Sequence, residues 1–126
     1  MRTIIAGSRT IKDYDLLKKV IKYSGFNITT VISGNHWEGV DVLGEKWAKE
    51  NNIPLELHPA KWKIYAYSAG PIRNREMAEV AEACIVLWDK KSKGSKSMIL
   101  NAMQQKLKLY VYDIEVNTDT PLFGEN

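Results

Sequence analysis

Short apolar stretches alternate along the chain with longer segments in which apolar residues recur every three or four positions. Runs of strand length lie at residues 3–6, 29–32, 53–57, 84–88 and 107–112, and helical spacing occupies most of the sequence between them. This alternation is typical of an α/β fold in which helices connect parallel strands. The pattern therefore predicts a single Rossmann-like domain of three layers, with a mainly parallel sheet of about five strands.

Local signals set the limits of the expected helices. Asp13 is a good N-cap for a first helix, and Gly25 is a typical residue at its end. Residues 59–70 are rich in aromatic and basic side chains and have no clear period, so we expect an irregular segment that ends where Pro71 begins a helix. The residues expected on the inner faces of the helices are Leu17, Val20, Ile21, Val40, Leu43, Trp47, Met77, Val80, Ala81, Ile99, Ala102 and Met103.

The chain has 126 residues, with 18 Lys and Arg against 15 Asp and Glu and a formal net charge of +3. We expect residues 1–112 to form one domain and residues 113–126 to be a C-terminal tail. A single cysteine excludes an internal disulfide and favours a reducing compartment, the cytoplasm. The N-terminus turns polar too early for a signal peptide, and no apolar run reaches the ~18 residues of a membrane span. The mild positive charge fits a phosphate-bearing small molecule as well as a nucleic acid.

Glycine, small polar and basic residues gather where ligand-binding loops are expected. Open parallel sheets bind ligands beyond the carboxyl ends of their strands, where glycine lets the backbone approach and a helix start favours an anion. The resulting candidates for ligand binding are Gly7, Ser8, Arg9, Ser33, Gly34, Asn35, Gly70, Pro71, Arg73, Asn74, Gly94, Ser95, Lys96 and Ser97. Residues 7–9 are also compatible with a simple tight turn, and residues 94–95 with an ordinary helix cap. A basic residue in the first turn of a helix is unfavourable because of the helix dipole. Arg73 is expected at such a position, and a bound anion would explain it.

Aromatic and acidic side chains form a second group of candidates. Trp37 can stack on a base or form a subunit contact. The aromatic segment 59–70 can be a lid over a base or, equally, a surface between subunits. The weak candidates for an acid catalyst are Glu38, Asp41 and Glu76, and Asp41 is also a ligand-binding candidate. His36 and His58 have no cysteine pair nearby, so we expect no metal site.

Four motifs together resemble one protein family. They are Ala6-Gly7-Ser8-Arg9; Val31-Ile32-Ser33-Gly34 with Gly39-Val40-Asp41; Ala69-Gly70-Pro71-Ile72-Arg73-Asn74-Arg75-Glu76-Met77; and Trp88-Asp89 with Ser92-Lys93-Gly94-Ser95. In this order, over about residues 1–111, they are similar to the YspA-like, cpYpsA-related branch of the SLOG superfamily. SLOG proteins are Rossmann-like domains that hold nucleotides or nucleotide-derived ligands. They include the Lonely Guy phosphoribohydrolases, the DNA-processing protein DprA and sensor domains of bacterial defence systems.

The resemblance implies roles for individual residues. Arg73 would lie near ribose and phosphate, like the motif arginine of the Lonely Guy enzymes, with Met77 as the methionine that follows it. Residues 94–95 would hold phosphate at a helix start. The catalytic glutamate of those enzymes falls at Met98, whose thioether can neither transfer a proton nor stabilise an oxocarbenium ion. The resemblance therefore favours binding over hydrolysis by the family's own mechanism.

The preferred function is binding of a nucleotide-derived, phosphate-bearing small molecule, which the protein senses or sequesters without turnover. A nucleotide, an ADP-ribose-like compound or a cyclic nucleotide signal would fit. Members of this branch are frequent in phages, where such a protein would act in counter-defence. The alternatives are a Lonely Guy-like nucleotide N-glycosidase and a DprA-like protein that binds single-stranded nucleic acid. We expect no cofactor, and we expect a homo-oligomer, because self-association would complete the pocket of so small a domain.

Overall fold

The computed structural model describes residues 1–114 of the chain, and five strands in this range form one sheet. They are β1 (Arg2–Gly7), β2 (Thr30–Ser33), β3 (Leu55–Leu57), β4 (Ala83–Trp88) and β5 (Lys108–Asp113), in the spatial order β3-β2-β1-β4-β5. Every neighbouring pair is parallel. The prediction of an α/β, Rossmann-like domain with about five strands is therefore confirmed.

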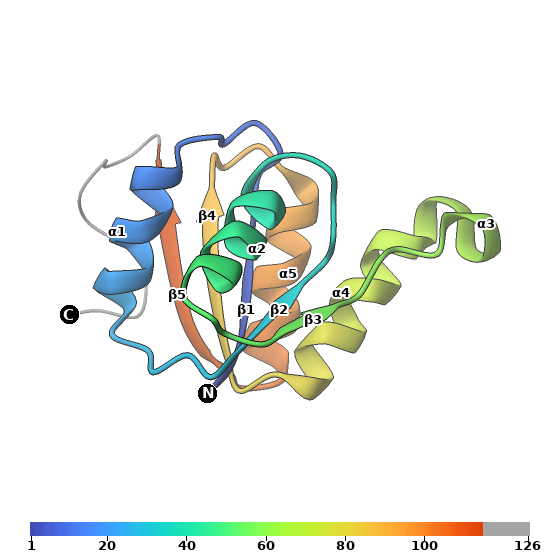
Figure 1. Cartoon of the computed structure of the whole chain (residues 1–126). Coiled ribbons are helices and arrows are strands. Elements are labelled where there is room, and N and C mark those ends of the chain that lie inside the picture. The colour runs from blue at the N-terminus through green and yellow to red at the C-terminus, as the bar shows by residue number, and fades with distance from the viewer. Residues whose placement is uncertain (115–126) are drawn as a thin grey trace.

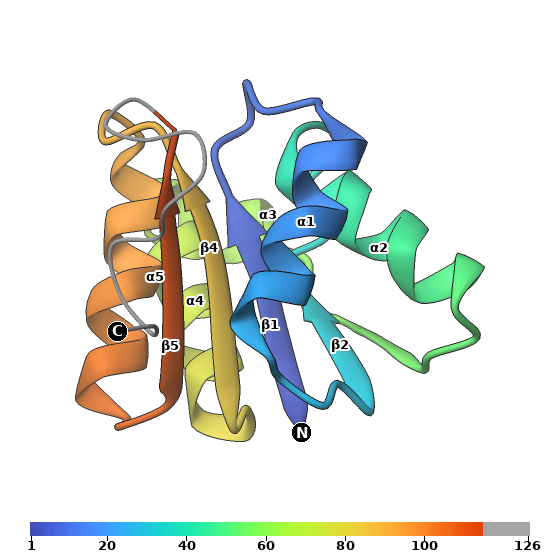
Figure 2. The same ribbon diagram turned by 90° about the vertical axis from the view of Figure 1, so that its left-hand side faces the viewer.

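Helices cover both faces of this sheet. Their bounds are α1 (Tyr14–Ser24), α2 (Val40–Glu50), α3 (Trp62–Tyr65), the 3-10 turn η1 (Ala66–Ser68), α4 (Ala69–Val80) and α5 (Lys93–Gln104). Figures 1 and 2 show α1 and α2 on one face, and α4 and α5 on the other. Successive side chains of a strand point to opposite faces, so Ile5 packs with α1 and α2 while Ile4 packs with α4 and α5. Each face thus has its own apolar core, and the expected three layers are present.

Helix α1 forms where the local signals predict it. The Asp13 side chain accepts a hydrogen bond from the Leu16 N–H at 3.0 Å, and Gly25 ends the helix in a left-handed conformation with φ of 70°. The three residues predicted to face inward, Leu17, Val20 and Ile21, are all buried. Capping and apolar spacing therefore specify this helix together.

Two side chains that were expected inside lie at the surface. Val80 is 42% exposed and Met103 is 57% exposed, so their predicted inward positions are wrong. The buried stripe of α5 consists of Ser95, Met98, Ile99 and Ala102, whose spacing of three and four residues leaves Met103 at its edge. In α4 the buried stripe includes Asn74 and Ala78, and Val80 is the last residue of the helix, beside that stripe.

The segment that was expected to be irregular, residues 59–70, contains helical turns. Helix α3 and η1 lie within it, and η1 continues directly into α4, which begins at Ala69 and not at Pro71. Proline fits at the third helical position because the N–H groups of the first turn have no intrahelical partner. Arg73 and Asn74 consequently lie in the second turn of α4, so the expectation of a first-turn position is wrong.

The C-terminal end of the sheet extends slightly beyond its expected limit. Strand β5 includes Asp113, one residue past the predicted domain boundary at residue 112. Of the expected tail, 113–126, residues 115–126 lie outside the described residues. In the described part of the chain, no helix combines the length and the apolar character that crossing a membrane requires.

Candidate functional site

A cavity of about 700 Å³ lies at the carboxyl ends of β1 and β4. The order of strands reverses between these two, because β2 and β3 continue the sheet beyond β1 while β5 continues it beyond β4. Open parallel sheets hold their ligands at such a switch point. The cavity therefore lies where the strand order alone would place a ligand.

Most of the predicted ligand-binding residues line this cavity. They are Gly7 at the end of β1, with Ser8 and Arg9 after it; Gly34 after β2 and Asp41 at the start of α2; Gly70, Pro71, Arg73, Asn74 and Met77 on α4; and Gly94, Ser95 and Ser97 on α5. The fold thus brings four segments that are far apart in the sequence to one space. Four other candidates, Ser33, Asn35, Trp37 and Lys96, do not line it.

Arg73 is held in place by two hydrogen bonds across the cavity wall. Its Nη1 donates to the Gly34 carbonyl oxygen at 2.6 Å, and its Nε donates to Asn74 Oδ1 at 3.0 Å. An added Cβ at Gly34 would lie 2.6 Å from Arg73 Nη1, so a side chain at this position would displace the guanidinium. Burial lowers the pKa of Arg73, and the charge of Asp41 opposes this effect. Arginine stays charged in proteins, so a partly desolvated cation faces the cavity.

Asn74 connects Arg73 to the start of α5. The side chain is 6% exposed, accepts from Arg73 and donates from Nδ2 to the Gly94 carbonyl oxygen at 3.3 Å. A second contact joins Nδ2 to Ser97 Oγ at 3.5 Å. The amide is therefore engaged within the protein, and its role at this cavity is to fix the position of α4 against α5.

The start of α5 is already capped by a side chain. Ser92 Oγ accepts from the Ser95 N–H at 3.3 Å and from the Ser95 hydroxyl at 3.1 Å. The Asp89 carboxylate accepts from the N–H groups of Lys91 and Ser92, at 2.8 and 2.9 Å. Burial raises the pKa of Asp89, but these hydrogen bonds outweigh it and hold the pKa below its ordinary value. The cap of α5 is therefore Ser92, and Gly94 and Ser95 lie in the first turn of the helix, so the reading of residues 94–95 as a helix cap is wrong. Both residues line the cavity.

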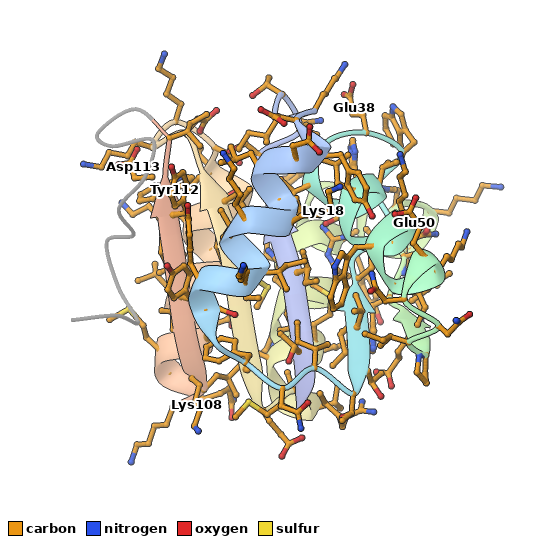
Figure 3. The ribbon with its side chains drawn as sticks, turned by 60° about the vertical axis from the view of Figure 1, so that its left-hand side comes forward. Lys18, Glu38, Glu50, Lys108, Tyr112 and Asp113 are labelled. Atoms are coloured by element: carbon orange, nitrogen blue, oxygen red, sulfur yellow. The ribbon has the colours of Figure 1, made fainter. Side chains whose placement is uncertain are left out.

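Asp41 supplies an acidic group on the opposite wall. Its Oδ2 accepts a hydrogen bond from the His36 N–H at 3.0 Å. Burial raises the pKa of this carboxyl, while that hydrogen bond and the charge of Arg73 oppose the shift. Of the three candidate acids, Asp41 lines the cavity and Glu38 and Glu76 do not. Glu38, labelled in Figure 3, lies 3.9 Å from Lys12 in an ion pair, and Glu76 is exposed on α4.

Ser33 and Asn35 contribute to the loop and not to the cavity wall. Ser33 is buried, donates to Glu45 Oε2 at 2.7 Å and accepts from the Asn35 N–H at 3.0 Å. Asn35 itself is exposed and has a left-handed backbone with φ of 58°. Lys96 is exposed on α5, outside the wall. These residues shape the loop after β2 or lie at the surface.

Trp37 points away from the cavity. Its ring stacks on His36 with 4.0 Å between ring centroids, and the side chain is 76% exposed. It borders a separate hollow of about 290 Å³ together with Glu38. His36, in contrast, lines the main cavity.

Several lining residues were not among the predicted binding residues. They are Ala6, Thr10, His36, Trp62, Asp89, Lys91, Ser92, Lys93 and Met98. Asp89 directly follows β4, so the same rule of strand ends could have identified it. Trp62 comes from α3, a short helix with no sequence period to place it. Within residues 1–114, no group of His, Cys, Asp and Glu side chains has the grouping that a metal ion needs.

The position of the Lonely Guy glutamate is apolar. Met98 lines the cavity and is 1% exposed, and Met77, equally buried, lines it from α4. Ala6 adds a third apolar contact from β1. The floor of the cavity near this position is therefore formed by thioether and methyl groups, with no carboxylate at residue 98.

Comparison with known proteins gives one match. The family model described as the YspA, cpYpsA-related SLOG family matches residues 1–65, which is just over half of the chain. The matched part contains β1, β2 and β3 with the loops after them, and Arg73 and Met98 lie beyond it. No curated protein and no solved structure matches the chain. The resemblance of the motifs is thereby confirmed at the level of the family: the chain belongs to the YspA, cpYpsA-related SLOG family.

Proposed function

We propose that the protein binds a nucleotide-derived small molecule carrying at least one phosphate, and that it senses or sequesters this molecule. The observation that supports this most is the convergence of glycine-containing loops, Arg73 and the start of α5 on one cavity. Its volume of about 700 Å³ falls within the range of roughly 300–1,000 Å³ common for small-molecule sites. Membership of the SLOG family suggests a nucleotide-related ligand.

The phosphate is expected at the start of α5. Lys91 and Lys93 line the cavity there, and Arg73 reaches it from α4. Ser92 accepts a hydrogen bond from the Ser95 N–H. The N–H groups of Lys93 and Gly94, the first two residues of α5, point the same way and are available to an anion. A phosphate would also reduce the cost of burying the guanidinium, because it would supply the opposite charge.

The base is expected toward α3. Trp62 lines the cavity beside Gly70, where an added Cβ would lie 3.7 Å from the indole Cη2. Pro71 and Met77 extend the apolar lining next to it. An indole face is a good surface for base stacking. The two ends of the cavity therefore match the two ends of a nucleotide, one cationic and one aromatic.

Binding without hydrolysis is supported by Met98. A phosphoribohydrolase of the Lonely Guy type needs a carboxylate at this position, and a buried thioether occupies it. A protein that holds such a ligand intact acts as a sensor or a sink. In a phage-encoded protein, the corresponding ligand would be a defence signal of the host, for example an ADP-ribose derivative or a cyclic nucleotide.

The test is mass spectrometry of the compounds released when purified protein is denatured. We expect a compound with a base and a phosphate in a near-stoichiometric amount, and less of it from Arg73→Ala than from Arg75→Ala. Arg75 is the matched control, because it is exposed on the same helix and does not line the cavity. Protein that releases no such compound, and also binds none of a panel of nucleotides, contradicts the proposal.

Asp41 supports a second candidate function, a nucleotide N-glycosidase with a relocated acid. Its carboxyl lines the cavity, and burial raises its pKa, as suits a general acid. Incubation with nucleoside monophosphates separates the two functions. Release of base by the wild type, lost in Asp41→Asn and retained in Glu76→Gln, would establish the enzyme and overturn the binding-only proposal.

A further inference from the structure

Arg73 lies between the two ends of the cavity. On one side its Nε donates to Asn74 Oδ1, and Asn74 Nδ2 donates in turn to the Gly94 carbonyl oxygen at the start of α5. On the other side its Nη2 lies 4.0 Å from the position of an added Gly70 Cβ, which is 3.7 Å from Trp62. Helix α3, which carries Trp62, lies at the far end of α4, away from the sheet (Figure 1). With the phosphate at α5 and the base at Trp62, the guanidinium lies beside the sugar.

Asp41 faces the same part of the cavity from the start of α2. The position of an added Gly34 Cβ lies 2.6 Å from Arg73 Nη1 and 3.0 Å from Asp41 Oδ2, so the cation and the carboxylate approach one point. Within residues 1–114, none of the ion pairs joins these two side chains. Both of them line the cavity. A ligand group that enters here therefore meets a guanidinium and a carboxylate together.

The Asp41 carboxylate can accept a further hydrogen bond. Its Oδ2 accepts from the His36 N–H at 3.0 Å, and no group in the described part of the chain donates to Oδ1. Burial raises the pKa of this carboxyl, although the His36 hydrogen bond and the charge of Arg73 oppose the shift. The protein therefore does not fully replace the water that the ionised form has lost. A ligand that donates a hydrogen bond to Oδ1 would stabilise the carboxylate.

The chemistry of this pair favours a hydroxyl group. A carboxylate only accepts hydrogen bonds and a guanidinium only donates them, whereas a hydroxyl does both. A phosphate oxygen beside Asp41 would be repelled by its charge. A guanidinium has five N–H donors, so a contact with a hydroxyl is compatible with a contact with the phosphate. Among the parts of a nucleotide, the ribose hydroxyls therefore fit best between Arg73 and Asp41.

We propose that Asp41 accepts a hydrogen bond from a free ribose hydroxyl, so that the protein binds ribonucleotide-derived compounds in preference to their deoxy forms. This inference rests on the proposed function, from which it takes the positions of the phosphate and the base. A ligand without the hydroxyl would leave the carboxylate in the cavity wall without a donor, and an unpaired charged group is costly there. Asp41 is thus a specificity-determining residue for the sugar, whether or not the ligand is hydrolysed.

Calorimetric titration with matched sugars tests this preference. The probes are the 5′-monophosphates and 5′-diphosphates of adenosine, guanosine, cytidine and uridine, each compared with its 2′,3′-dideoxy form. We expect at least one ribonucleotide to bind about tenfold or more tightly than its dideoxy form, as for loss of a hydrogen bond to a charged group. Equal binding of the two forms overturns the inference and leaves the proposed function standing. Failure of every probe to bind also overturns it, and mass spectrometry of the released compounds then tests the proposed function separately.

Variants of two acids test whether Asp41 causes the preference. Asp41→Ala should reduce it to within about twofold, through weaker binding of the ribonucleotide. Asp41→Asn keeps an acceptor for the His36 N–H and should reduce the preference in the same direction, which covers the case that the alanine variant does not fold. Glu38→Ala is the matched control and should keep the full preference, because Glu38 precedes α2 in the same segment and does not line the cavity. Folded Asp41 variants that keep the full preference, or a Glu38 variant that loses it, overturn the inference.

Discussion

The two walls of the cavity are built in different ways. One wall consists of the loops after β1 and β2, in which Gly7 and Gly39 are packed so tightly that an added Cβ would overlap the backbone of Leu87 or of Arg9. The other wall begins with Trp62 on α3, which is 52% exposed and belongs to a segment that projects from the domain. The first wall is fixed by tight backbone contacts, whereas the second wall makes few such contacts.

This difference indicates how the site would work. A phosphate needs donors at fixed positions, and the start of α5, which the Arg73–Asn74–Gly94 connection holds against α4, would provide them. A base needs a flat apolar surface and tolerates some movement, which a tryptophan on a projecting segment can provide. The preorganised part of the site would therefore fix the phosphate, and the adjustable part would accommodate the base.

The largest effect, on stability, is expected from adding a side chain in the wall formed by the loops after β1 and β2, which we call the rigid wall. Gly39→Ala puts a methyl group against the backbone of Arg9 at a position with φ of 80°, so we expect a loss of about 3 kcal/mol in the free energy of unfolding. Gly25→Ala is the control, because it has φ of 70° but nothing within 4 Å, and about 1 kcal/mol is expected there. Urea denaturation measures both. Equal losses would show that the wall is not tightly packed.

The next effect concerns the cation that connects the two walls. Arg73→Ala removes a charge-assisted contact to phosphate, so it should weaken binding of a phosphate-bearing ligand by about 1.5–3 kcal/mol, or roughly 10- to 150-fold. Arg75→Ala should bind as the wild type does, since Arg75 does not line the cavity. Isothermal titration calorimetry measures the dissociation constants. Unchanged binding by Arg73→Ala would remove this residue from the site.

A smaller effect on binding is expected at the wall that begins with Trp62. Trp62→Ala removes a stacking surface and should weaken binding by about 1 kcal/mol, or roughly fivefold. Trp37→Ala is the comparison, because this residue is more exposed and lies outside the cavity. The same titrations distinguish the two tryptophans. Equal loss from both variants would mean that the base extends beyond the cavity, toward the loop after β2.

The smallest effect is a change in how the stability of the protein depends on pH, and it concerns Asp41. Burial raises the pKa of the Asp41 carboxyl in the folded protein above its ordinary value. The protonated carboxyl therefore contributes fully to the free energy of unfolding below the ordinary pKa, and this contribution is lost as the pH rises through the raised pKa. Asp41→Asn cannot ionise and keeps an acceptor for the His36 N–H. We therefore expect the free energy of unfolding of the variant, relative to that of the wild type, to increase as the pH rises across this window. Urea denaturation at a series of pH values measures this difference. A difference that is constant with pH contradicts the assignment.

The sequence predicts the sheet well because its signals are local. Apolar runs specify strands, the Asp13 cap and Gly25 limit α1, and the rule of strand ends places Gly7, Arg9 and Gly34 at the cavity. Helix α3 escapes prediction because four residues, Trp62–Tyr65, are too short to show a helical period.

Other features of the site depend on side-chain contacts that the sequence does not reveal. Ser33 resembles a binding residue in sequence, but its hydroxyl donates to Glu45, twelve positions away. Trp37 looks like a base-stacking residue in sequence, but its ring stacks on the neighbouring His36 and the side chain is 76% exposed. Neither partner follows from residue type or spacing, so only the folded chain identifies which polar and aromatic side chains remain for a ligand.

Calorimetric titration of the wild-type protein tests the central claim most directly. The panel consists of nucleoside monophosphates and diphosphates, ADP-ribose and cyclic nucleotides, each compared with the nucleoside that lacks its phosphate. We predict that at least one phosphorylated compound binds with one molecule per cavity and that its nucleoside binds far more weakly. Absence of binding across the panel, or equal affinity for a nucleotide and its nucleoside, would contradict the proposal that the cavity recognises a phosphate-bearing ligand.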